Sequence, residues 1–198
     1  LLREEGEKWL GEKVAARFGR LPYLFKVLDV KDMLSIQVHP TKEEAEKGFA
    51  RENAAGIPLN ASNRNYKDDN HNPEVMVALS ELWLLHGFKK KELLEETLRN
   101  EPLFHPLLSI FEKESYYGLY KYVMELPQNE VDAILVPLIQ KIQPRYQANQ
   151  LSRAEPGYWA CKAIGDQPLV TLDRGIFSIY FFNILHLHPG QAIFQGAG

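Results

Sequence analysis

Cysteine, long apolar runs and net charge are all scarce in this 198-residue sequence. The one cysteine, Cys161, cannot form an internal disulfide. The longest mainly apolar run, residues 176–187, contains polar side chains and is shorter than the roughly 18 apolar residues that a membrane span needs. Twenty-three Lys and Arg against 26 Asp and Glu leave a formal net charge of −3, which gives no basic surface for nucleic acid. These scarcities argue against disulfide-stabilised, membrane-spanning and nucleic-acid-binding proteins.

The sequence does have an ordinary globular balance, with 45% hydrophobic and 25% charged residues. At roughly 150 residues per domain, the length fits one domain or slightly more. The first eight residues carry neither a basic segment nor a cleavage signal of the secretory type. We therefore expect a cytoplasmic protein.

Hydrophobic periodicity divides the chain into strand-like and helix-like segments. Residues 1–19 favour one or two short helices, and Thr41 with Glu44 forms a capping box that predicts a helix over 42–53. Residues 60–73 are typical of a loop, whereas residues 89–165 carry helical stripes. Prolines, Pro144 among them, punctuate these stripes, and Pro137 should kink or split the third one. Strands are predicted over 21–30, 33–40, 74–79, 82–88, 176–187 and 191–195, with 74–79 and 82–88 as a pair. The order of strands, helical insertion and strands predicts an α+β fold.

A row of polar side chains follows the predicted strand around residue 37. Ser35, Gln37 and His39 would share one strand face, because side chains two residues apart point to the same side. Glu74, which follows the rigid Pro73, could add a carboxylate. An oxygen and nitrogen ligand set without thiolate suits zinc in an open catalytic site, or manganese. The alternative is a polar strand face that solvent wets.

Three further residues have two interpretations each. Lys26 lies between Phe25 and Val27, where an ammonium group either binds an anion such as phosphate or extends from a strand edge into water. His186 and His188 alternate with leucines and would share a strand face. We interpret these two histidines as ordinary strand-face residues rather than as metal ligands.

Several motifs, taken in order, resemble the type I mannose-6-phosphate isomerases. They are residues 24–28 (LFKVL), 34–40 (LSIQVHP), 52–59 (ENAAGIPL) and 65–74 (NYKDDNHNPE). The similarity continues from Asp173 to the glycine-containing turn at 196–198, so that it spans essentially the whole chain. These motifs match the family in their order and spacing as well as in their residue identities.

The resemblance implies a zinc-dependent enzyme that interconverts mannose 6-phosphate and fructose 6-phosphate. It implies that Gln37, His39 and Glu74 are zinc ligands and that Lys26 and Ser35 help to hold the substrate phosphate. The expected partner is therefore a small-molecule hexose phosphate, with neither nucleic acid nor membrane involved, and we expect a monomer. No general base is assigned.

The fold implied by the resemblance is a cupin-type jelly roll interrupted by a helical insertion. The expected domains are residues 1–88 as part of the catalytic cupin domain, 89–165 as the insertion and 166–198 as the return to the cupin strands. The family's fourth ligand, a histidine, and a catalytic arginine would follow position 198. The chain is therefore expected to be an internal piece of a longer enzyme.

One position departs from the family pattern. The family has lysine where this chain has Asn72, between His71 and Pro73. An asparagine side chain can donate a hydrogen bond to a hydroxyl group. It carries no positive charge, however, and it cannot act as an acid or a base near neutral pH. A non-catalytic cupin homologue that binds a metal or a sugar phosphate is therefore the alternative to an active isomerase.

Overall fold

The computed structural model describes residues 6–198, which form two units divided between Leu34 and Ser35. In the first unit, helix α1 (Gly6–Leu10) and helix α2 (Glu12–Phe18) are separated by Gly11, whose φ of 76° favours glycine. The prediction of one or two short helices in this segment is confirmed. The first five residues of the predicted segment lie outside the described residues.

The strands predicted over residues 21–30 and 33–40 are wrong for the described chain. Both segments are extended, but neither pairs with another described segment. Their apolar side chains are exposed, with Phe25 at 78% and Val38 at 87% of full exposure. A β-strand forms only where a neighbouring strand accepts and donates its backbone hydrogen bonds, and local sequence does not reveal whether such a neighbour is present.

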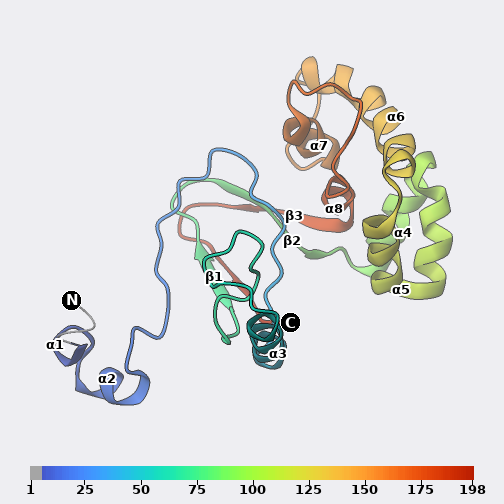
Figure 1. Ribbon diagram of the computed structural model, residues 1–198. Coiled ribbons are helices and arrows are strands. Elements are labelled where there is room, and N and C mark those ends of the chain that lie inside the picture. The colour runs from blue at the N-terminus through green and yellow to red at the C-terminus, as the bar shows by residue number, and fades with distance from the viewer. Residues whose placement is uncertain (1–5) are drawn as a thin grey trace. The chain divides into compact units, whose positions relative to one another are not determined.

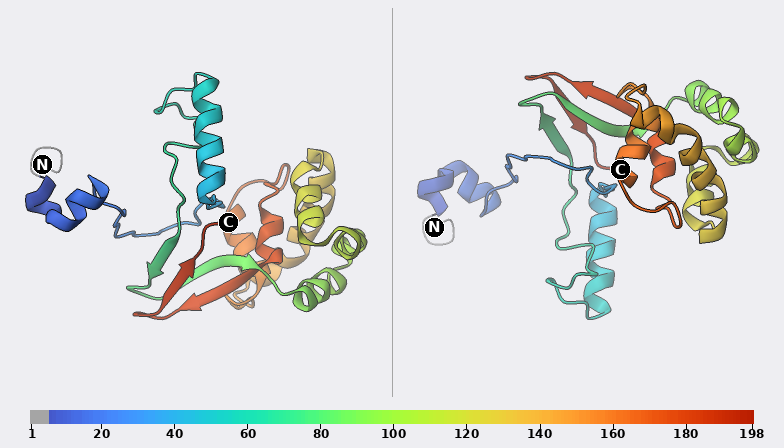
Figure 2. Two further views of the ribbon diagram at one scale, coloured as in Figure 1. Left: turned by 90° about the horizontal axis from the view of Figure 1, so that it is seen from below. Right: turned by 90° about the horizontal axis from the view of Figure 1, so that it is seen from above.

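The second unit contains two antiparallel ladders of two strands each (Figures 1 and 2). Strand β1 (Glu74–Val77) pairs with β4 (Ala192–Gln195), and strand β2 (Leu82–Phe88) pairs with β3 (Phe182–Leu187). The predicted pairing of β1 with β2 is therefore wrong, because each strand pairs with one from the other end of the unit. The architecture is mixed α and β, and these short ladders do not display a jelly-roll strand order.

Helices fill the chain between β2 and β3. They are α4 (Lys91–Asn100), the 3₁₀ turn η1 (Pro102–Phe104), α5 (His105–Glu125), α6 (Gln128–Gln147), α7 (Pro156–Ile164) and α8 (Ile176–Phe181). Because β2 and β3 are neighbours in one ladder, the helical segment is inserted between two paired strands (Figure 1). No helix among residues 6–198 is long and apolar enough to cross a membrane.

Helix α8 corrects the strand predicted over 176–187, since only residues 182–187 form a strand. All six residues of α8 are buried, and its aromatic rings pack around Phe104 of η1. A short apolar run that is buried on every side has no polar face, so its period does not distinguish a helix from a strand. Helix α6 also runs continuously through Pro137 and Pro144, so neither proline ends or splits it.

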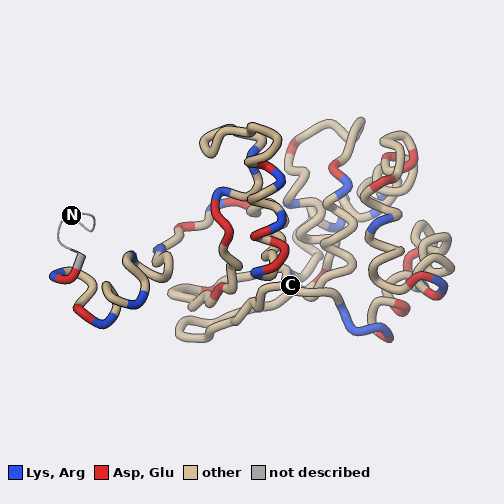
Figure 3. Tube along the Cα trace, turned by 60° about the horizontal axis from the view of Figure 1, so that its bottom comes forward, with Lys and Arg blue, Asp and Glu red and all other residues tan. Residues whose placement is uncertain are grey.

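Helix α3 (Lys42–Ala54) confirms the helix predicted from the capping box. The Thr41 hydroxyl accepts a hydrogen bond from the Glu44 backbone N–H at 3.2 Å, which satisfies one free donor of the first turn. Lysines, arginines and carboxylates follow one another along α3, whereas the strands carry few charges (Figure 3). The loop predicted over residues 60–73 is also confirmed, and it runs from α3 to β1.

Candidate metal centre

The structure brings two of the predicted ligands together, one from each side of α3 and its loop. His39 Nε2 lies 3.9 Å from Glu74 Oε2. The His39 side chain is mostly buried, at 14% exposure, whereas the Glu74 side chain remains 54% exposed. Two ligand atoms bound to one tetrahedral zinc ion lie about 3.4 Å apart, so a shift of about half an ångström would suit a shared metal.

A hydrogen bond to the backbone fixes the tautomer of His39. His39 Nδ1 lies 2.6 Å from the carbonyl oxygen of Asn72, which can only accept. Nδ1 therefore carries a proton, and in the neutral imidazole Nε2 presents its lone pair on the side of Glu74. A ligating histidine commonly donates its other N–H to a carbonyl or carboxylate in this way. The donor set is thus chemically prepared for a metal ion.

The other predicted site residues are described by position alone. Gln37 and Ser35 lie in the exposed extended segment that ends at His39. Lys26 is exposed in the first unit, among the apolar side chains of residues 24–28. Their roles toward metal and phosphate stay predictions.

The loop that carries Asn72 and leads to Glu74 is anchored to α3 by a buried ion pair. Arg64 Nε lies 3.1 Å from Glu52 Oε2, and both side chains are almost entirely buried. Arg64 also donates to the carbonyls of Tyr66 and Ile57 and to Asn53 Oδ1, at 2.6–2.8 Å. The guanidinium group therefore joins residues 57 and 66 of the loop to the helix.

Glu52 completes this anchor by accepting backbone hydrogen bonds from the loop. Its carboxylate oxygens accept from the N–H of Tyr66 at 2.9 Å and of Asn65 at 3.2 Å. The bond from Tyr66 is the largest cause that holds the pKa of Glu52 below its usual value; burial opposes it, and Asn65 and Arg64 assist. Gly48 lets the Tyr66 ring approach the helix, because a Cβ atom at that position would overlap the ring.

Backbone contacts bring the last described residues to the same place. Glu74 is the register partner of Gln195 at one end of the β1–β4 ladder. Three residues later, the Gly198 N–H donates to the His39 carbonyl oxygen at 2.9 Å. Residues 195–198 therefore pass beside both His39 and Glu74.

Two hollows of the described surface lie elsewhere. One, of about 310 Å³, is lined by Lys89 just after β2, by residues of α4 and β3, among them Thr97 and Asn183, and by the start of α7 with the segment before it. Burial lowers the pKa of Lys89, and the carboxylate of Glu96 opposes this effect. None of the predicted ligand or phosphate-binding residues lines this hollow.

Sequence reasoning missed the residues that support the site. A capping box revealed α3, but nothing in the local pattern paired Glu52 with an arginine twelve residues away. The available signal was weak: Arg64 is the single arginine of a loop rich in asparagine, which also contains Lys67. The role of Asn72 was also hidden, because its backbone carbonyl, and not its side chain, contacts His39.

Comparison with known proteins gives a consistent set of relatives. The family model described as "Phosphomannose isomerase type I, catalytic domain" matches residues 2–91, which include all the predicted site residues. Mannose-6-phosphate isomerase of Escherichia coli K12 is 36% identical over 189 residues, covering 93% of this chain and 46% of the relative. The human enzyme of the same name is 32% identical over 209 residues, covering 98% of this chain and 46% of the relative.

Solved structures agree with the sequence comparison. The crystal structure of mannose 6-phosphate isomerase from Salmonella typhimurium bound to fructose 6-phosphate and zinc is similar with a TM-score of 0.81 and 34% identity. The match covers 99% of this chain and 49% of that one. The apo form of the same enzyme gives a TM-score of 0.82. The chain thus spans about half the length of the relatives that it matches.

Proposed function

Because the chain belongs to the type I phosphomannose isomerase family, we propose that it serves a zinc-dependent isomerase that interconverts mannose 6-phosphate and fructose 6-phosphate. The observation that carries the proposal is the pairing of His39 with Glu74, in which the Asn72 carbonyl fixes the histidine tautomer. This arrangement fits a metal ligand pair.

In this proposal Gln37, His39 and Glu74 hold the zinc ion. When bound there, zinc supplies a Lewis acid that polarises the sugar carbonyl and stabilises negative charge on its oxygen. The Asn72 carbonyl keeps the His39 ring oriented, and the buried Glu52–Arg64 pair keeps the loop that carries Glu74 in place. Because Glu74 binds the zinc ion in this proposal, we do not assign it as the base that moves the proton between C1 and C2.

Lys26 and Ser35 are proposed to bind the substrate phosphate. An ammonium group and a hydroxyl group both donate hydrogen bonds to phosphate oxygens. The phosphate is remote from the reacting C1 and C2 atoms, so its binding energy serves to orient them. The Asn72 side chain can donate a hydrogen bond to a sugar hydroxyl but cannot supply the positive charge that the family's lysine gives.

The proposal includes a cupin-type jelly roll in which residues 1–88 and 166–198 contribute strands and residues 89–165 form the insertion. Two observations support it. Helices α4 to α7 lie between two strands that pair with each other. The unpaired extended segments before α3 expose apolar side chains such as Phe25 and Val38, as expected of strands that pack against further structure.

Removing the His39 imidazole tests the metal site. We expect His39→Ala to lower the zinc content of the dialysed protein by one equivalent per chain, measured by atomic absorption, because a ligand is lost. His71→Ala is the matched control, since His71 is an exposed histidine of the same region, and it should keep the zinc. Unchanged zinc in His39→Ala would refute the assignment.

The alternative, a metal-binding homologue without turnover, is favoured by Asn72. A coupled assay that follows fructose 6-phosphate formed from mannose 6-phosphate separates the two functions. Turnover by the zinc-loaded protein supports the isomerase. No turnover with zinc bound, and gain of turnover in Asn72→Lys, would assign the loss to this one side chain.

A further inference from the structure

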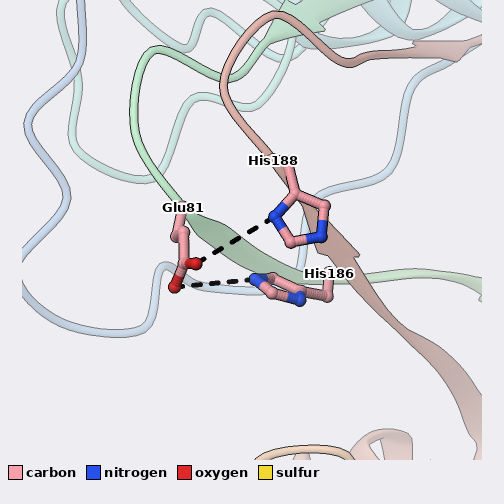
Figure 4. Close-up of side chains that lie close together, drawn as sticks. All are labelled: Glu81, His186 and His188. Atoms are coloured by element: carbon pink, nitrogen blue, oxygen red, sulfur yellow. Dashed lines mark ion pairs between the residues drawn. The ribbon is translucent and has the colours of Figure 1, made fainter.

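Three side chains that the first site does not use converge where β3 ends: Glu81, His186 and His188 (Figure 4). One ligand-type atom from each residue lies within 4.8 Å of the other two. Glu81 Oε2 lies 3.8 Å from His186 Nε2, and Glu81 Oε1 lies 4.0 Å from His188 Nδ1. Two imidazoles and a carboxylate therefore face one small volume.

The strand register produces this convergence. β2 and β3 are antiparallel, with Trp83 opposite His186 and Leu82 opposite Leu187. One step further along the same register places Glu81 opposite His188. Because residues two apart share a face of the ladder, both histidines and Glu81 project from the same side. The cluster is a consequence of strand pairing.

Two contacts hold the histidines in place. The His186 ring stacks on the Trp83 indole, with ring centroids 4.2 Å apart and planes inclined by 6°. The His188 backbone N–H donates to Gln191 Oε1 at 2.8 Å, and the Gln191 backbone N–H donates to the His188 carbonyl oxygen at 2.9 Å. Gly190, with a φ of 85°, follows Pro189 at the centre of this tight turn. A metal that binds here would therefore meet partly pre-organised ligands.

One of these ligand atoms lacks a partner. His186 Nε2 is buried and has no hydrogen-bond partner among the described residues. The Glu81 oxygen, at 3.8 Å, is too distant for a hydrogen bond. Buried polar atoms are normally satisfied by protein, water or an ion. A cation between Nε2 and the carboxylate would satisfy both groups.

The donor set selects the kind of cation. Zinc binds imidazole nitrogen and carboxylate oxygen at about 2.0–2.2 Å, which places tetrahedral ligand atoms roughly 3.4 Å apart. The two contacts to Glu81 are longer than this by about half an ångström, and the side chains of Glu81 and His188 are both about 60% exposed and able to move. Two imidazoles with one carboxylate suit Zn²⁺, Cu²⁺ or Ni²⁺ better than Mg²⁺ or Ca²⁺.

We infer that Glu81, His186 and His188 form a second transition-metal site, completed by water. It lies at the opposite end of the β1–β4 ladder from Glu74, where Ala78 exchanges backbone hydrogen bonds with Gln191 and Gly190. The metal ties the connection between β1 and β2 to the turn between β3 and β4. This inference does not depend on the proposed isomerase function.

Zinc titration of the His39→Ala protein tests the site after the first one has been removed. We expect isothermal titration calorimetry to give one Zn²⁺ per chain. Adding His188→Ala or Glu81→Gln should weaken binding by about tenfold or more, because a site of three protein ligands loses one. His105→Ala is the control, because His105 lies in the helical segment, and it should leave the affinity unchanged.

Copper provides a local readout. Cu²⁺ bound at His186 lies close to the stacked Trp83 ring, so it should quench tryptophan fluorescence and saturate at one equivalent. The quenching should be lost in His188→Ala, whose exposed side chain can be removed with little effect on folding. No saturable binding of either metal would overturn the inference. Zinc affinity in the His188→Ala and Glu81→Gln variants that is unchanged from the His39→Ala parent would overturn it as well, whether or not the first site holds zinc.

Discussion

Replacing Arg64 with methionine should loosen the loop that presents Glu74. Methionine retains much of the apolar bulk but removes the charge and the hydrogen bonds to Ile57, Tyr66 and Asn53. It also leaves the Glu52 carboxylate buried without its cation. Removing one partner of a buried pair costs about 3–5 kcal/mol, and the lower figure applies because Glu52 keeps two backbone donors.

A loss of about 3 kcal/mol corresponds to roughly a hundredfold change in an opening equilibrium. Hydrogen exchange measured by mass spectrometry should therefore accelerate about a hundredfold in residues 56–73 of Arg64→Met, while α4 to α7 stay unchanged. Zinc binding at His39 should weaken in parallel, because the same loop carries Asn72 and leads directly into Glu74.

Two controls make this result interpretable. Lys47→Met breaks an exposed ion pair with Glu43 at 2.6 Å and should change exchange very little, since solvent screens such pairs. Arg64→Met combined with Glu52→Gln removes both buried charges and should recover part of the loss. Exchange in Arg64→Met within about threefold of the parent, which is less than 1 kcal/mol, would refute the anchoring role.

Two other predictions concern stability. The pKa of Glu52 is lowered in the folded chain, chiefly by the hydrogen bond from the Tyr66 N–H. The Glu52 carboxylate therefore contributes its full stabilisation of the fold above the unfolded pKa, and this stabilisation is lost as the pH falls through the lower folded pKa. Exchange protection of residues 56–73 should therefore decrease below about pH 4.5, and Glu52→Gln should remove this acid dependence; an unchanged pH profile would contradict it. Phe104→Ala should destabilise the helical segment by about 3–5 kcal/mol in urea unfolding followed by circular dichroism, because the ring is fully buried against Tyr180 and α8. A loss below about 1 kcal/mol would contradict that packing.

Local signals predicted the elements that depend on local interactions. The Thr41 cap fixed the start of α3, and the Asn- and Asp-rich composition identified the following loop. The family resemblance, rather than spacing alone, selected His39 and Glu74 from the polar residues of this region. The structure then supplied what neither source contained, namely the 2.6 Å contact between His39 and the Asn72 carbonyl.

The errors have two physical causes: a fully buried apolar run has no period that distinguishes helix from strand, and the pairing partners of strands are distant in sequence. Residues 176–181 were expected to be a strand, yet burial on all sides accommodates them as helix α8. β1 was expected to pair with β2, yet its partner begins more than one hundred residues later. Asn183 interrupts an apolar run, and its amide donates to the carbonyls of His86 and Phe88 at the bulge in β2. A local pattern cannot show that function for a polar residue.

The two candidate metal centres differ in how far their ligands are separated along the chain. His39 and Glu74 are brought together by one helix and one loop, so a single anchored segment determines their distance. Glu81 and His188 are 107 residues apart and meet only because β2 and β3 pair in one register. A one-residue slip would move one partner to the other face of the ladder. The second site therefore reports on correct strand pairing around the inserted helices, which the first site does not.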